Sequence, residues 1–199
     1  MIYCFLTAFS FADEVDTYIN SIEVKYRDVQ SLSATFTQET SNVMLQTPYL
    51  QQGTFALSKP HFLHWEVTSP LEQHYYADKD KITVWTPSQN QAIISSNQET
   101  SHDVSSLLTN LNELKTRYNI VLLDKENDQI HLKLSSDKLD GEIELWFTQK
   151  DYVLNQVMVN TSNAKTKVIL SEVTLNPTFE QDEFTFVPAE GADVIDSRQ

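Results

Sequence analysis

The stretch Gln51–Tyr76, QQGTFALSKPHFLHWEVTSPLEQHYY, gives the clearest indication of how this chain folds. Its first part alternates, with Phe55 and Leu57 separated by smaller residues, and this two-residue period is typical of a half-buried strand. Pro60 interrupts the alternation, because proline has no N–H to donate to a neighbouring strand. The sequence therefore predicts one strand that ends just before Pro60.

The second part of the stretch repeats the alternation with larger side chains. Leu63, Trp65 and Val67 fall on one face of the expected strand, and the opposite face carries ionisable groups. Pro70 ends this second run. The two strands together thus present a large aromatic and aliphatic surface on one side of a sheet.

Three motifs occur in a fixed order along the chain, and they span nearly all of it after residue 12. They are Ala34-x-Phe36-x-Gln38; then Gly53-x-Phe55-x-Leu57-x-Lys59-Pro60 with Phe62-x-x-Trp65 and Pro70-x-Glu72-Gln73; and Phe184-x-Phe186-x-Pro188-x-x-Gly191-x-Asp193-Val194-Ile195. These motifs resemble those of the LolA family of periplasmic lipoprotein carriers. The resemblance implies an incomplete β-barrel with a helical lid over its mouth.

The remaining patterns indicate two helices and many short strands. Apolar residues recur at helical spacing over 13–28 and again from about Asp103 to Glu113. From Tyr118 onward, strand-like segments follow one another through short polar turns, and Phe184–Val187 has the pattern of a last short strand. Such short connections exclude a parallel βαβ array. We expect one mainly β (α+β) domain over 13–199, with a strongly curved antiparallel sheet or incomplete barrel covered by two or three helices.

The first twelve residues, MIYCFLTAFSFA, carry no charge and are mostly apolar. Ser10-x-Ala12 fits a small-x-small cleavage site, so we interpret residues 1–12 as a signal peptide remnant and expect a soluble periplasmic protein that begins at Asp13. A buried first strand or helix is the alternative. The one cysteine, Cys4, lies in this segment, so cleavage would leave neither a disulfide nor a thiol nucleophile.

Composition and missing motifs narrow the function classes. A net charge of -14 argues against nucleic acid as a partner, since phosphates require Lys and Arg, and it favours solubility. No motif of a hydrolase, a zinc protease or a nucleotide-binding loop is present. His64 and Glu66 share a strand face without an evident third ligand, and Glu142 and Glu144 fit a solvated face. We therefore expect no enzyme activity, no metal and no cofactor.

Aromatic and aliphatic side chains remain as the candidate functional surface. They can form an ordinary core, or they can line a cavity in which each buried acyl methylene contributes about 0.8 kcal/mol. The family resemblance favours the cavity. The residues expected to line it are Phe55, Leu57, Leu63, Trp65, Tyr76 and Trp85 from the sheet, with Leu107, Leu108 and Leu111 from the lid.

The resemblance to LolA implies a monomeric carrier that shields the acyl chains of lipoproteins. It would receive them from an inner-membrane ABC exporter and deliver them to an outer-membrane acceptor lipoprotein. Lys59 stands where the family typically has an arginine that latches the lid, so we expect Lys59 to be a weaker latch. The alternatives are a LolA-like module for another lipid, a periplasmic sensor and, less favoured, a lipid hydrolase.

Overall fold

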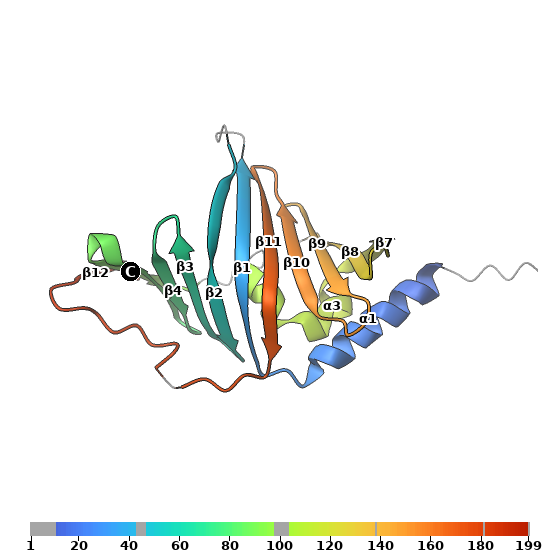
Figure 1. Ribbon diagram of the computed structural model, residues 1–199, viewed down its shortest axis with the longest axis horizontal. Helices are drawn as coiled ribbons and strands as arrows, with labels where there is room; N and C mark the ends of the chain where they lie inside the picture. Colours follow the sequence, from blue (N-terminus) through green and yellow to red (C-terminus); the bar gives the residue numbers. More distant parts are fainter. Residues whose placement is uncertain (1–10, 43–46, 98–103, 138, 181, 199) are drawn as a thin grey trace, which may run out of the picture.

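A computed structural model describes residues 11–42, 47–97, 104–137, 139–180 and 182–198 of the chain. These residues form one twelve-stranded sheet, and the helices of residues 11–27 and 104–117 pack on one of its faces (Figure 1). The helical segments are α1 (Phe11–Arg27), η1 (Pro87–Gln89), α2 (Val104–Thr109), η2 (Leu111–Glu113) and α3 (Leu114–Arg117). The expected mainly β, largely antiparallel class is confirmed.

Within β1–β6 and within β7–β11, the strands follow one another with short connections, as the sequence predicts. They are β1 (Ser31–Asn42), β2 (Tyr49–Ser58), β3 (Phe62–Ser69), β4 (Gln73–Ala77), β5 (Lys81–Thr86), β6 (Gln91–Ser96), β7 (Asn119–Asp124), β8 (Gln129–Ser135), β9 (Glu142–Thr148), β10 (Leu154–Asn160), β11 (Ala164–Leu175) and β12 (Asp193–Asp196). Their order across the sheet is β12-β6-β5-β4-β3-β2-β1-β11-β10-β9-β8-β7. Only the β12–β6 pair is parallel among the described strands.

Helix α1 forms where the apolar spacing predicts it and packs on the β7–β10 end of the sheet (Figure 1). Ile19, Ile22 and Tyr26 recur at helical spacing and are buried together. The Tyr26 hydroxyl oxygen accepts a hydrogen bond from Leu154 N–H of β10 at 3.0 Å, and its ring lies 6.4 Å from that of Phe147. These contacts fix the helix against the sheet.

The second helical segment differs from the prediction of one continuous helix. Its described part is divided into α2, η2 and α3, with Asn110 between α2 and η2. Asn110 N–H bonds to the Leu107 carbonyl, and Glu113 N–H bonds to the Asn110 carbonyl, so both bonds span three residues as in a 3₁₀ turn. Asparagine has a low helix propensity, because its side chain can bond to nearby backbone groups in non-helical conformations. This accounts for the break at Asn110. Asp103, the predicted start, lies outside the described residues.

The predicted strand Phe184–Val187 is wrong, because the terminal strand is β12 at Asp193–Asp196, beside β6. Phe184 and Phe186 instead lay their rings on the outer face of the sheet. The centroid distances are 5.9 Å from Phe184 to Phe62 and 5.6 Å from Phe186 to Trp85. Their alternation therefore reflects docking on a sheet face rather than pairing with a strand.

Candidate functional site

A cavity of about 760 Å³ lies between the inner face of β1–β5 and residues 109–117 of the helical segment. Leu57, Leu63, Trp65 and Val67 from the opening stretch line it, as their common face predicts. The lining also includes Gln30, Gln38, Gln51, Lys59, Pro60, His61, Phe62, Tyr75, Ala77, Ile82, Asn97, Thr109, Asn110, Asn112, Glu113 and Arg117. The volume lies in the range of ordinary ligand pockets.

The apolar wall of the cavity is held by aromatic packing within the sheet. The Trp65 ring lies 4.1 Å from that of Phe36 and is stacked on that of Phe55 at 5.3 Å, with an angle of 10° between the planes. Phe55 is therefore beneath Trp65, buried in the core, and not among the lining residues. Phe55 supports the wall from the core side, and the Trp65 ring faces the cavity.

The opposite wall is polar, so the cavity is amphipathic rather than uniformly apolar. Asn110, Asn112, Glu113 and Arg117 line it from the helical side. The three leucines predicted for the lid, Leu107, Leu108 and Leu111, are instead buried in the hydrophobic core. These leucines anchor the helical segment to the core and do not line the cavity.

Lys59 connects the two walls. Its Nζ donates a hydrogen bond to Asn112 Oδ1 of η2 at 3.2 Å, while its backbone N–H bonds to the Gln30 carbonyl at 2.8 Å. Burial lowers the pKa of Lys59 from its usual value, and the nearby Glu113 carboxylate opposes that shift. The ammonium thus contacts the helical segment at the position where a latch is expected.

Tyr76 and Trp85 lie on the other face of the sheet. Both face Phe186 of the C-terminal segment, at centroid distances of 6.0 Å and 5.6 Å. In the register of β3 and β4, Tyr75 is opposite Trp65, so Tyr75 is the tyrosine that reaches the cavity. The alternation would have identified Tyr75 if the register of the hairpin had been known.

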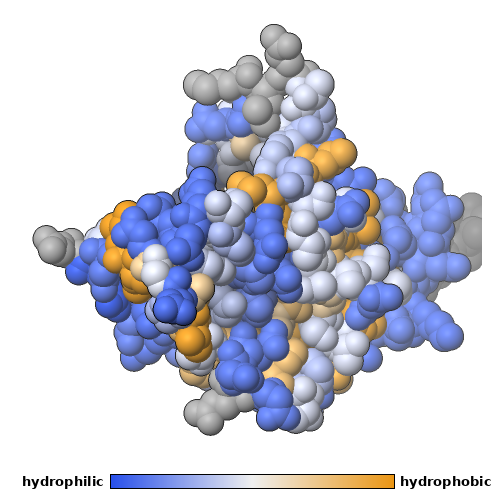
Figure 2. Space-filling model, turned by 60° about the vertical axis from the view of Figure 1, so that its left-hand side comes forward, coloured by the Kyte–Doolittle hydropathy of each residue, from blue (hydrophilic) through white to orange (hydrophobic). Residues whose placement is uncertain are grey.

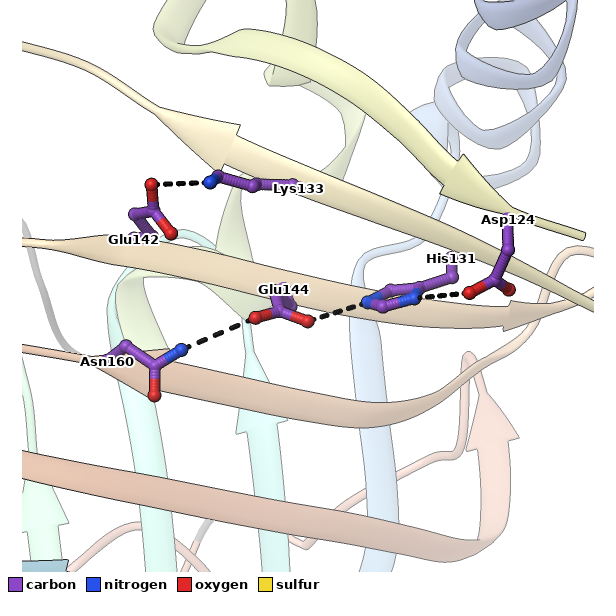
Figure 3. A network of polar contacts seen from close by, with 6 residues as sticks. All are labelled: Asp124, His131, Lys133, Glu142, Glu144 and Asn160. Atoms are coloured by element: carbon purple, nitrogen blue, oxygen red, sulfur yellow. Dashed lines mark hydrogen bonds and ion pairs between the residues drawn. The ribbon is translucent and has the colours of Figure 1, made fainter.

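A separate polar network occupies the outer face of β7–β10 (Figure 3). His131 Nδ1 lies 3.1 Å from Asp124 Oδ2, and His131 Nε2 lies 2.7 Å from Glu144 Oε2. The other Glu144 oxygen accepts from Asn160, while Glu142 forms an ion pair with Lys133. Glu142 and Glu144 therefore have different partners and do not share a site.

The surface at the β12–β3 end is mainly hydrophilic, with separate apolar patches (Figure 2). Exposed apolar side chains of these strands and of the C-terminal segment include Phe62, Ile93, Val187 and Ile195. Within the described ranges, the helices are too short or too polar for a membrane span.

The family model and the curated relatives that match this chain agree on one family. The family model described as "Outer membrane lipoprotein carrier protein LolA" matches residues 27–187. An outer-membrane lipoprotein carrier protein of Francisella tularensis subsp. novicida is 25% identical over 207 aligned positions, covering 98% of this chain and 96% of that protein. One from Xylella fastidiosa is 26% identical over 180 positions, with 86% and 84% covered.

A solved structure supports the fold alone. An uncharacterised conserved protein of Thermus thermophilus superposes with a TM-score of 0.60 at 10% sequence identity, covering 92% of this chain and 99% of that one.

Proposed function

Because this chain belongs to the LolA family of outer membrane lipoprotein carrier proteins, we propose that its cavity between β1–β5 and residues 109–117 holds the acyl chains of lipoproteins. The wall formed by Leu57, Leu63, Trp65 and Val67 is the observation that supports this. Each methylene transferred from water to this wall contributes about 0.8 kcal/mol, so several methylenes give strong binding without directional contacts.

The finer architecture follows from the same arrangement. In the proposal, the sheet acts as an incomplete barrel, with β7 and β12 as the edge strands of its described part, and residues 109–117 act as a lid on one side of the mouth. The polar side chains of this lid face the cavity, so water and lipid headgroups can be accommodated there while acyl chains lie against Trp65.

Family membership also supports the route proposed for the cargo. The carrier receives lipoproteins from an inner-membrane ABC exporter and delivers them to an outer-membrane acceptor lipoprotein. The protein works in the periplasm as a monomer, after removal of residues 1–12. Residues 1–10 lie outside the described residues, and Phe11 and Ala12 belong to α1.

Displacement of a fluorescent hydrophobic probe by a triacylated peptide tests acyl binding. Leu63→Asp is expected to abolish both probe binding and displacement, because it introduces a charge into the apolar wall. Ile93→Asp, on an exposed position of β6 that does not line the cavity, is the matched control and retains both. Displacement that is equal in both variants and in the natural protein would show that the acyl chains bind elsewhere.

Lys59 is proposed as the latch between sheet and lid. Lys59→Arg is expected to slow probe entry, because a planar guanidinium offers several donors to η2 where the ammonium has its 3.2 Å bond to Asn112 Oδ1. Lys59→Leu and Asn112→Ala remove that bond, so each should accelerate entry severalfold, as measured by stopped-flow fluorescence. Unchanged entry rates in all three variants would contradict the latch while leaving acyl binding intact.

A further inference from the structure

The outer face of the β3–β4 hairpin carries ionisable side chains that the carriage of acyl chains does not use. His64 and Glu66 project from β3, and His74 projects from β4 directly opposite Glu66. One ligand atom from each of these three side chains lies within 4.8 Å of the others. The two facing imidazole nitrogens, His64 Nε2 and His74 Nδ1, are 3.3 Å apart.

The outer nitrogen of each imidazole faces a carboxylate. His64 Nδ1 lies 3.1 Å from Glu183 Oε1, and His74 Nε2 lies 3.1 Å from Glu72 Oε1. A carboxylate accepts hydrogen bonds, so each contact requires the N–H of its ring to be on that outer nitrogen. A neutral imidazole carries one N–H. The two inner nitrogens are then left with lone pairs directed at each other, and a cation between them removes this repulsion.

We propose that His64, His74 and Glu66 bind a divalent transition metal ion, with Zn²⁺ as the ion that best fits. Two imidazole nitrogens on one tetrahedral zinc ion, with bonds of about 2.0–2.1 Å, lie roughly 3.3–3.4 Å apart. The 3.3 Å between the facing nitrogens matches that separation. Glu66 supplies the carboxylate of a two-histidine, one-glutamate ligand set, and water completes the tetrahedron.

The surrounding carboxylates have the arrangement that supports metal-binding histidines. A ligating imidazole usually donates its other N–H to a carboxylate, which fixes the tautomer and orients the ring. Glu183 does this for His64, and Glu72 does it for His74. Both imidazole side chains are largely buried, at 13% and 15% exposed, so their orientations are held by packing as well.

The His131 network shows the contrasting case (Figure 3). Both nitrogens of His131 face carboxylates, those of Asp124 and Glu144, so neither is left for a metal ion. Its two acidic partners lie on opposite sides of the ring and cannot converge on one ion. Both clusters pair histidine with carboxylates, but only the β3–β4 cluster has two imidazole nitrogens directed at one point.

Zinc binding would also affect the chain that covers this face. Glu183 belongs to the segment that connects β11 to β12, and it reaches His64 from 119 residues further along the chain. A bound ion keeps the His64 N–H directed at Glu183, so the segment is held more firmly to β3. Zn²⁺ should therefore slow amide hydrogen exchange at residues 182–187 and leave β8 unchanged.

Calorimetric titration of the chelator-treated full chain with Zn²⁺ tests the proposal. We expect one ion per chain. His64→Asn and His74→Asn should weaken binding most, and Glu183→Gln, which alters a positioning residue, should weaken it about 10–100-fold. His131→Asn is the matched control and should bind as the natural protein does.

Cobalt absorption provides a second readout that does not depend on the variants folding. Co²⁺ in the natural protein should show the intense visible bands of tetrahedral coordination, and one equivalent of Zn²⁺ should remove them. No zinc binding, weak octahedral cobalt bands, or zinc binding that survives His64→Asn with His74→Asn would overturn the proposal.

Discussion

The β8–β11 and β2–β5 halves of the sheet have the same antiparallel pairing, but their inner faces are covered differently. In the β8–β11 half, Leu132, Leu145 and Phe147 are fully buried beneath α1 and its neighbours. In the β2–β5 half, the corresponding face opens onto the 760 Å³ cavity, and Leu63 and Trp65 are only partly buried. We call these the filled half and the open half.

The difference shows how one sheet combines stability with binding. The filled half transfers its apolar side chains fully out of water, and this burial stabilises the fold. The open half leaves part of its apolar surface uncovered. The free energy of burying that surface is therefore gained when a ligand binds and not when the chain folds. Substitutions in the filled half should therefore change folding, and those in the open half should mainly change binding.

The largest expected effect is on the free energy of unfolding, and it is seen by substituting one leucine in each half. Leu145→Ala should lower the free energy of unfolding by about 2–5 kcal/mol, because a buried cavity remains. Leu63→Ala should cost less than half as much, since its side chain already borders an open space. Urea unfolding of both variants measures this, and equal losses would abolish the distinction between the halves.

The next effect is a dependence on alkaline pH. Burial raises the pKa of Tyr26 to about 12, against a usual value near 10. When folding raises the pKa of a group, that group contributes fully to the free energy of unfolding below its unfolded-state pKa. The contribution is lost as the pH rises through the folded-state pKa. The loss between pH 10 and 12 should be about 2–3 kcal/mol.

Tyr26→Phe should flatten that part of the pH profile in urea unfolding experiments. Tyr75→Phe provides the comparison in the open half, where burial also raises the tyrosine pKa but the side chain is only half-buried. Its effect on the slope should be smaller. A Tyr26→Phe profile as steep as that of the natural protein would assign the loss to other groups.

The smallest effect is at Gly53, where β2 passes β3. A Cβ at this position would lie 1.8 Å from the Glu66 carbonyl oxygen and 3.0 Å from the Phe36 ring. Gly53→Ala should therefore force the strands apart and cost about 1–3 kcal/mol. Thr54→Ala, at the exposed neighbouring position, is the control and should cost about 0.5 kcal/mol or less. Equal melting temperatures for both variants would contradict the steric reason.

Local patterns predicted much of the fold. The alternation in Gln51–Tyr76 placed β2 and β3 and put Leu57, Leu63 and Trp65 on one face, which is the face that lines the cavity. Helix α1 and the meander after Tyr118 also follow from apolar periodicity and turn residues. Such signals are local, because strand and helix geometry alone decide which neighbours share a face.

Those patterns could not predict the register of paired strands or where distant segments pack on the sheet. Tyr75 and not Tyr76 reaches the cavity because of how β4 pairs with β3, and Phe186 covers Trp85 because the C-terminal segment returns across the outer face. A period of two identifies the faces of a strand but not what covers each of them.

Motifs and periodicity were sufficient to predict the family, the mainly β class and the apolar face of β2 and β3. The burial of the helical leucines in the core, the contact of Lys59 with Asn112, and the approach of His74 and Glu183 to His64 could be seen only in the folded chain. The physical reason is that periodicity acts over a few residues, whereas these contacts are set by how distant segments pack against one curved sheet.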